Sequence, residues 1–238
     1  MSPQKRERVF IAPSRRELLC GLIYLPLHMF LVGELIYFVA LLAGIDLTLV
    51  ALNLIYMLVG TLYLMLTMSR YLKASFAPFR AFGASHLWLL PAGWGMRLLL
   101  GLPIGIVIVA LTPELVSPNE EIVREILAQS FLPAAFMAIV LAPIVEEILF
   151  RALLFASIRK KSRFLAYAVS TILFALLHIV AFLFFAFSPD LFIVMLLYIP
   201  AGIALCWAYE RSGSIWTPIA LHAFMNLVAV LLGPLLGL

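Results

Sequence analysis

Apolar stretches of about twenty residues follow one another along almost the whole chain, and this pattern constrains the fold more than any other feature. A transmembrane helix needs about 20 consecutive, mostly apolar residues to cross the hydrocarbon core of a bilayer. The sequence therefore predicts an all-α, polytopic helical bundle of about seven spans, with a range of six to eight. The spans are expected near residues 18–42, 47–68, 88–112, 131–157, 164–187, 190–209 and 214–237.

The amino-acid composition excludes the other common classes of protein. Of the 238 residues, 65% are hydrophobic and 12% are charged, whereas a soluble domain is about half apolar and about a quarter charged. Two cysteines, Cys20 and Cys206, are too few for a disulfide scaffold, and the apolar content is too high for a disordered chain. We expect a single membrane domain over residues 1–238, with a basic segment at residues 1–17.

The basic residues alternate between the two sides of the predicted spans. If the amino terminus is cytoplasmic, thirteen of the 16 Lys and Arg residues lie in cytoplasmic segments, and only Arg124 lies in an outer one. This bias predicts a cytoplasmic amino terminus. The net charge of +4 is therefore assigned to membrane orientation, and nucleic acid is not expected as a partner. A compact, basic chain of this kind is expected as a multi-pass protein of a prokaryotic cell (inner) membrane.

Three charged side chains stand inside the predicted span 131–157, namely Glu146, Glu147 and Arg151. An unpaired charge at the centre of a membrane helix costs about 2.5–3.5 kcal/mol, so a passive helix would not easily retain three of them. Glu147 and Arg151 are four residues apart with the glutamate first, so we expect them to pair on one helix face. Glu146 is turned from Glu147 by about 100°, which leaves it as the freer carboxylate.

Pro143 precedes the two carboxylates by a few residues. Because proline lacks an N–H and clashes with the preceding helical turn, we expect it to leave the carbonyl of Ile139 without a helical partner and to bend the helix. Such a bend would make room for a water-filled cavity beside the carboxylates.

Polar side chains at a matching depth occur in two later spans. His178 lies in the span 164–187, whereas His222 and Asn226 lie four residues apart on one face of the span 214–237. Intramembrane ionisable groups usually face the interior of the bundle and mark a functional site. We therefore expect these side chains to converge with the glutamates in one buried site.

The three motifs together resemble those of a known family. The chain reads EExxxR from Glu146, FxxxH ending at His178, and HxxxN from His222, in this order. The set is similar to that of the CAAX protease and bacteriocin-processing family of intramembrane endopeptidases, which is related to the type 2 CAAX prenyl protease. The resemblance covers about residues 131–233, and the first three spans carry no matching motif.

The resemblance implies an intramembrane endopeptidase. Glu146 would act as general base on a water, and His178 would help to position or activate that water. His222 and Asn226 would stabilise the oxyanion of the substrate, and the expected ion pair would hold the first carboxylate in place, although the roles of the two glutamates could be exchanged. The candidate catalytic residues are Glu146, Glu147, Arg151, His178, His222 and Asn226.

The sequence leaves metal dependence and the class of function open. Glu146, His178 and His222 are alternative ligands for zinc or another divalent metal, with a free position for water. Because the histidines come from separate helices and no HExxH motif is present, a mechanism without metal or other cofactor is favoured. The alternatives are a metal-dependent protease, a non-enzymatic immunity or scaffold protein, and a proton-coupled transporter. The expected partners are a peptide or protein substrate at the membrane and the lipid bilayer; no oligomeric state is predicted.

Other polar side chains stand in the first and third spans. Glu34 and Arg97 are interpreted as an interhelical pair or as part of a substrate cleft. His28 is also intramembrane and receives no assigned role. Gly202 is one of several glycines that are expected to permit close helix contact.

Overall fold

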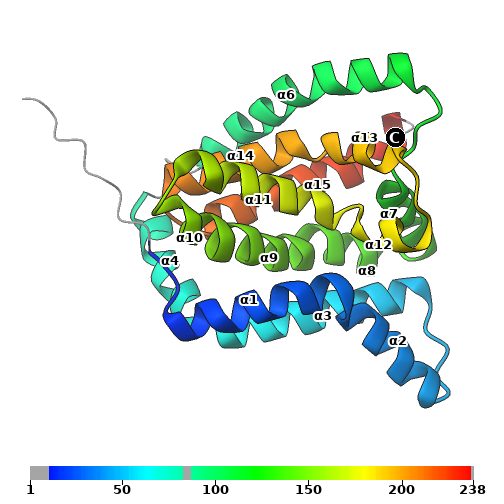
Figure 1. Cartoon of the computed structure of the whole chain (residues 1–238), viewed down its shortest axis with the longest axis horizontal. Helices are drawn as coiled ribbons and strands as arrows, with labels where there is room; N and C mark the ends of the chain where they lie inside the picture. Colours follow the sequence, from blue (N-terminus) through cyan, green and yellow to red (C-terminus); the bar gives the residue numbers. More distant parts are fainter. Residues whose placement is uncertain (1–10, 83–86, 237–238) are drawn as a thin grey trace, which may run out of the picture.

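The computed structural model of the chain describes residues 11–82 and 87–236, and its regular structure within these residues is helical (Figure 1). This confirms the predicted all-α bundle, whereas residues 1–10 of the expected basic segment lie outside the described part. In chain order the helices are α1 (Arg15–Phe30), α2 (Val32–Leu42), α3 (Leu49–Thr67), α4 (Ser69–Phe82), α6 (Leu89–Leu111), α7 (Pro118–Gln129), α8 (Phe131–Phe136), η1 (Met137–Leu141), α9 (Ala142–Glu147), η2 (Ile148–Phe155), α10 (Ala156–Arg159), α11 (Arg163–Leu177), α12 (Val180–Phe185), α13 (Asp190–Leu196), α14 (Ile199–Ser212) and α15 (Trp216–Leu236).

Six of the seven predicted spans have a counterpart in the described part of the chain. Five stretches there are long and apolar enough to cross a membrane, and α1 with α2, bent by 61°, makes a sixth if the pair counts as one span. The chain is therefore a multi-pass membrane protein. The five stretches are Leu49–Thr67, Leu89–Leu111, Phe131–Arg159, Asp190–Ser212 and Trp216–Gly233.

The predicted continuous span 164–187 is wrong. The helix α11 has 15 residues, or about 22 Å at 1.5 Å per residue, which is shorter than a hydrocarbon core of about 30 Å. It ends because the backbone tightens: the N–H of His178 bonds the carbonyl of Ala175, and the N–H of Ile179 bonds that of Leu176. Such i to i−3 bonds are typical of the last turn of a helix.

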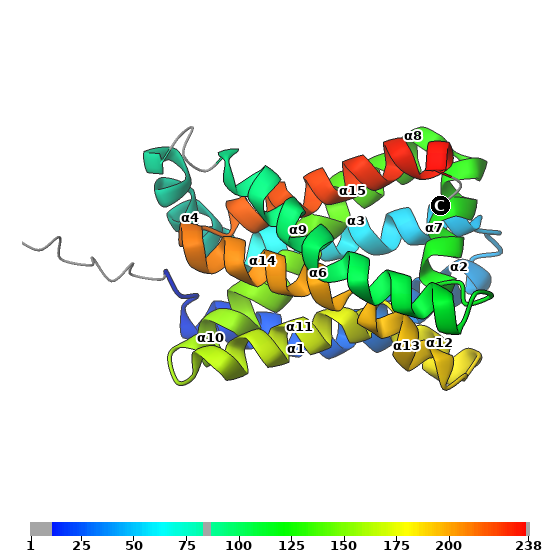
Figure 2. The same cartoon turned by 90° about the horizontal axis from the view of Figure 1, so that it is seen from above.

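The central span Phe131–Arg159 forms the core of the bundle. It is the most enclosed span, with 56% of its most apolar window buried, and its side chains from Val145 to Phe155 are almost all inaccessible. The helices α1, α3, α11, α14 and α15 pack around it (Figures 1 and 2). In contrast, only 6% of the window of α6 is buried, and its large apolar side chains face outward. This arrangement places the charged residues of the central span as far as possible from lipid.

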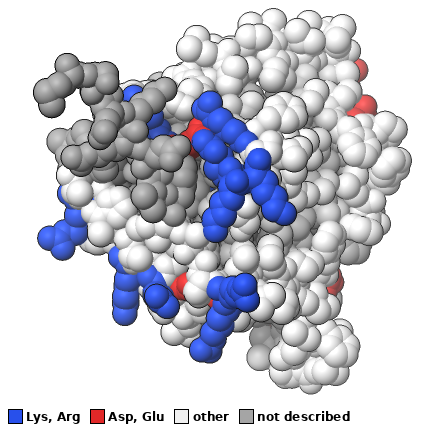
Figure 3. Space-filling model, turned by 60° about the vertical axis from the view of Figure 1, so that its left-hand side comes forward, with Lys and Arg blue, Asp and Glu red and all other residues white. Residues whose placement is uncertain are grey.

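Basic side chains gather at one end of the bundle. Figure 3 shows many Lys and Arg side chains on the face where α1 and α11 begin and where α10 and α14 end. Ser14 caps the start of α1 there, Ser162 caps that of α11, and Gly213 ends α14 with a φ of 71°. The amphipathic α7 lies at the opposite end (Figure 1). The segregation of charge agrees with a common side for these loops, and the cytoplasmic assignment of that side stays a prediction.

Candidate functional site

Glu147 and Arg151 form an ion pair that the bundle encloses completely. Arg151 Nη1 lies 3.0 Å from Glu147 Oε1, and both side chains are 0% exposed, which confirms the predicted pairing. Arg151 Nη2 also donates to the carbonyl of Gly202 at 3.1 Å. The same Glu147 oxygen lies 2.9 Å from His222 Nδ1. Through these contacts the pair connects the central span to α14 and α15.

The proton on His222 can be placed from its partner. An ionised carboxylate only accepts hydrogen bonds, so Nδ1 of His222 donates to Glu147. In the neutral ring, Nε2 is then the free nitrogen, and it is the nitrogen that lies 4.0 Å from Glu146 Oε2. This distance is too long for a direct hydrogen bond.

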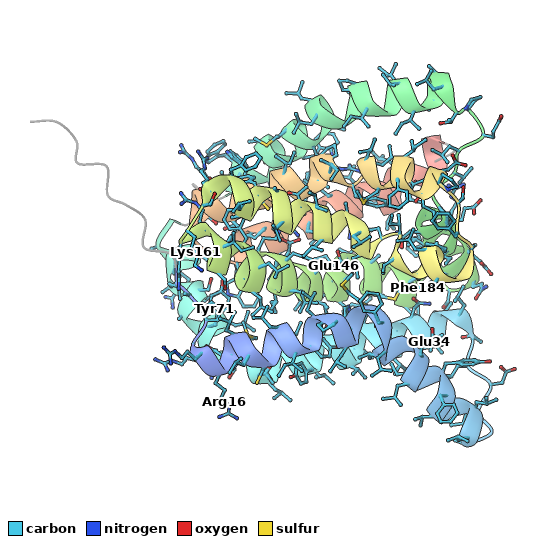
Figure 4. The ribbon with its side chains drawn as sticks, in the orientation of Figure 1. Arg16, Glu34, Tyr71, Glu146, Lys161 and Phe184 are labelled. Carbon is cyan, nitrogen blue, oxygen red and sulfur yellow. The ribbon has the colours of Figure 1, made fainter. Side chains whose placement is uncertain are left out.

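Glu146 lies beside the pair without joining it. Its side chain is 6% exposed, and Figure 4 shows it near the middle of the bundle. Its Oε2 is enclosed and accepts no hydrogen bond from the described residues. Buried polar atoms nearly always have hydrogen-bond partners, so an unpartnered atom requires an explanation. A functional role is one such explanation. The helix geometry thus separates a fixed carboxylate, Glu147, from a freer one, Glu146.

His178 reaches the site from the end of α11. Its Nδ1 lies 2.9 Å from the carbonyl oxygen of Phe174, which can only accept, so Nδ1 donates and Nε2 is the basic nitrogen of the neutral ring. The Phe174 ring contacts both histidines edge-on, at 4.8 Å from His178 and 5.7 Å from His222 between ring centroids. The Arg151 guanidinium lies 4.5 Å from the centre of the same ring. Phe174 therefore packs as expected and also joins the motifs.

Asn226 takes a different position from the one predicted for an oxyanion donor. Its Nδ2 donates to the carbonyl of Ala138 at 2.7 Å. The segment η1 is π-helical, a register in which a carbonyl bonds the N–H five residues ahead, and the N–H of Ala142 bonds the carbonyl of Met137. The partner of Ala138 would be Pro143, which has no N–H.

The π-helical register adds a second carbonyl to the predicted effect of Pro143. In an α-helix, Pro143 would deprive the carbonyl of Ile139, whereas in the π-helical register the carbonyl five residues before it is that of Ala138. The Asn226 amide supplies the missing donor from α15. Because the extra backbone width of η1 accommodates the proline, the stretch Phe131–Arg159 remains one span.

Two contributors were not identified as site residues from the sequence. Gly202 offers its carbonyl to Arg151, and a Cβ at this position would lie 2.8 Å from Thr171 Cγ2, so the expected close helix contact is present. Tyr198 stacks its ring on His178 with 4.1 Å between ring centroids. The sequence signal for Gly202 was a glycine in an apolar span, whereas Tyr198 gave no signal.

The described residues do not fit the metal alternative as they stand. No group of three or more His, Cys, Asp and Glu side chains in the described ranges is arranged to hold a metal ion. His178 and His222 each donate Nδ1–H to a protein oxygen, which leaves Nε2 free in both rings, so these bonds by themselves do not decide against a metal. Because the described residues contain no such group, we derive no step through a metal.

The interpretation of Glu34 and Arg97 as a pair is wrong. Glu34 lies on α2, at the opposite side of the bundle from α6, which carries Arg97 (Figures 1 and 4). The carboxylate whose charge reaches Arg97 is that of Glu120, in the first turn of α7. The apolar pattern of the sequence placed both residues in membrane spans, but it did not specify which helices are neighbours.

Comparison with known proteins bears directly on this site. Residues 128–228 match the family model described as type II CAAX prenyl endopeptidase Rce1-like. This region is therefore similar to that family. The match contains all three motifs and confirms the resemblance drawn from them.

Part of the chain also aligns with a curated relative. The "putative membrane peptidase YdiL" of Bacillus subtilis (strain 168) is 32% identical over 94 residues, which cover 39% of this chain and 34% of that protein. The match therefore spans about a third of the relative's length. No solved structure matches the chain. These findings support a membrane peptidase in general terms, and the first three spans lie outside the matched residues.

Proposed function

We propose that the protein is an intramembrane endopeptidase that hydrolyses a peptide bond of a membrane-associated substrate with a glutamate-activated water. One observation carries the proposal: the enclosed carboxylate of Glu146 has an unpartnered oxygen beside the fixed network of Glu147, Arg151 and His222. A pure packing role would not require a free carboxylate there, because burying an unpaired polar group costs stability.

In the proposed reaction, Glu146 takes a proton from a water, and the water oxygen attacks the carbonyl carbon of the peptide. The proton then passes to the leaving amine as the C–N bond breaks. One water is consumed, and the products are a carboxylic acid and an amine. His178, with Nε2 as its free basic nitrogen, would orient the attacking water.

The fixed pair has a supporting role in this proposal. Glu147 orients His222, whose Nε2 faces the reacting region and, when protonated, can donate to a developing oxyanion. Arg151 balances the charge of Glu147 within the bundle. Asn226 retains one N–H beyond the bond to Ala138, so it can assist only if substrate reaches that N–H.

Metal-free chemistry remains our preference, because no group of three or more His, Cys, Asp and Glu side chains within the described residues is arranged to hold a metal ion. The proposed setting is a prokaryotic inner membrane, with the basic end of the bundle and the amino terminus on the cytoplasmic side. The bacterial origin of the aligned relative and the positive-inside rule support this assignment. The proposed partners are a peptide or protein delivered at the membrane and the surrounding lipid.

The first prediction is that Glu146→Gln abolishes cleavage and preserves folding. The amide keeps the shape of the side chain but cannot accept the proton, so turnover of membrane-delivered peptides should fall more than about a hundredfold. Cleavage is measured by mass spectrometry of products from reconstituted protein, and folding by thermal unfolding of the same samples.

The matched control is Glu34→Gln, the same change at an exposed glutamate of α2, which should leave turnover unchanged. Equal turnover of wild type and Glu146→Gln would overturn the assignment of the base. Loss of wild-type cleavage on chelation, with stoichiometric zinc in the purified protein, would replace the metal-free mechanism by the metal-dependent alternative. Binding of peptides without any cleavage would favour the non-enzymatic alternative.

A further inference from the structure

Tyr198 lies directly against the histidine that we propose to orient the water. It is the residue before α14, and its ring stacks on His178 with 4.1 Å between centroids and 24° between planes. Tyr198 is thus a neighbour of the site that no sequence motif contains.

The hydroxyl of Tyr198 is held by the first turn of α7. It lies 2.8 Å from Ser117 Oγ and 3.5 Å from Asn119 Nδ2. Nδ2 of Asn119 can only donate, so the tyrosine oxygen accepts from it and is free to donate its own proton to Ser117. Ser117 is only 4% exposed and also caps α7, where its Oγ accepts from the N–H of Glu120 at 3.4 Å.

His178 needs such support because of its place in the chain. It follows the last residue of α11 and lies in the short turn that separates α11 from α12. Among the described residues, the ring makes one hydrogen bond, from Nδ1 to Phe174, which leaves the ring able to rotate unless a neighbour covers its face. The Tyr198 ring covers one face, and the Phe174 ring meets it edge-on.

We infer that Tyr198 is a positioning residue, which fixes the His178 ring through its stack while the first turn of α7 holds the tyrosine in place. The inference rests on the proposed function. Ser117 and Asn119 lie before the matched residues 128–228, so this support is a feature of the present chain that the family match does not include. The amphipathic α7 thereby gains a role at the site besides joining two spans.

Substitutions can separate the ring of Tyr198 from its hydroxyl. Tyr198→Leu removes the stack and should lower kcat by about ten- to a hundredfold with little change in KM, because misplacing a catalytic group slows the chemical step more than binding. Tyr198→Phe keeps the ring and loses one hydrogen bond, so kcat should fall by no more than about fivefold. Tyr198→Trp should recover most of the activity that leucine loses.

The orientation of the ring is measured independently of activity. The chain has 4 histidines, so ¹⁵N-histidine NMR of the full-length protein in nanodiscs can resolve their ring nitrogens. We expect His178 to show a single tautomer with the proton on Nδ1, and Tyr198→Leu to average or broaden its two nitrogen signals while those of His222 stay unchanged. The matched control is Tyr71→Phe, which removes a buried tyrosine hydroxyl bonded to Tyr209 outside the site and should leave His178 unchanged.

Two results would overturn the inference. One is an unchanged His178 spectrum in Tyr198→Leu. The other is a loss of activity in that variant that is explained entirely by a higher KM or by a smaller amount of folded protein. If the wild-type protein cleaves no peptide, the proposed function fails, and the NMR experiment still decides whether Tyr198 fixes the ring.

Discussion

Two buried histidines, one in each half of the molecule, have opposite surroundings. His222 belongs to a charged site that contains Glu146, Glu147 and Arg151. We call these four residues the charged site. His28, in the first span, is equally buried, and its neighbours are the tyrosines Tyr24 and Tyr56. We call these three residues the aromatic site.

The aromatic site satisfies its histidine by neutral contacts. The ring of His28 stacks on Tyr56 with 4.4 Å between centroids and only 7° between planes, and Nδ1 lies 3.3 Å from the hydroxyl of Tyr24. Tyr56 donates to the backbone carbonyl of His28 at 2.8 Å. In both sites, enclosed side-chain atoms lack a hydrogen-bond partner among the described residues. They are His28 Nε2 in the aromatic site, and Glu146 Oε2, Glu147 Oε2 and Arg151 Nε in the charged site. Burial and an unpartnered atom therefore do not distinguish a candidate reactive site; fixed opposite charges beside that atom do.

Breaking the charged site should have the largest effect on stability. Arg151→Ala leaves the carboxylate of Glu147 buried without its cation, which should lower the free energy of unfolding by about 3–5 kcal/mol and abolish cleavage. Glu147→Ala should cost about as much, and the double variant should lose less than the sum of the two. Equilibrium unfolding in bicelles measures these free energies.

The control for these single and double variants is the ion pair of Arg159 with Glu210 at the basic end of the bundle. Its atoms lie 2.7 Å apart, but the arginine side chain is 34% exposed, so Arg159→Ala should cost about 1 kcal/mol or less. Additive losses for Glu147→Ala and Arg151→Ala would show that the buried pair does not act as a unit.

The same substitution in the two sites tests the comparison most directly. His222→Phe should reduce cleavage more than about a hundredfold, because it removes the donor next to Glu146. His28→Phe keeps the stack on Tyr56 and should keep cleavage within about threefold of wild type, with a loss of about 1 kcal/mol or less in stability. Peptide turnover and thermal unfolding are measured on both variants. If His28→Phe reduced cleavage more than His222→Phe, the assignment of the chemistry to the charged site would be wrong.

A smaller effect is expected where Asn226 supports the backbone. Asn226→Ala leaves the carbonyl of Ala138 without a donor and should lower the free energy of unfolding by about 1–3 kcal/mol. Pro143→Ala in that background restores an N–H five residues ahead of Ala138 and should recover part of the loss. Chemical denaturation of the single and double variants measures both values. If Pro143→Ala brings no recovery, the assignment of the unpaired carbonyl is incorrect.

The sequence was sufficient for contacts that helix geometry alone determines. The ion pair of Glu147 and Arg151 follows from their spacing of four, and the long apolar stretches follow from the thickness of a bilayer. The convergence of His222 on the glutamates followed from the cost of a charge in lipid, which favours an inward orientation.

Other contacts depend on features that periodicity does not contain. The break after α11 comes from local backbone hydrogen bonds at His178. The partner of Asn226 depends on a π-helical register, which differs by one residue from the α-helical register assumed from the sequence. The nearby charge at Arg97 is that of Glu120 rather than of Glu34, because neighbour relations among spans are set by tertiary packing. The catalytic roles of the site residues stay predictions.

The two π-helical segments that flank α9 have a consequence for how the two glutamates share their work. Each residue of an α-helix turns the chain by about 100° around the helix axis. The wider turns of η1 and η2 therefore change the direction in which side chains point on either side of Glu146 and Glu147. Deleting one residue from η1 would restore an α-helical pitch and rotate the preceding part of the span relative to the glutamates. The rotation of the helix around its axis thus helps to decide which of the two glutamates stays outside the ion pair.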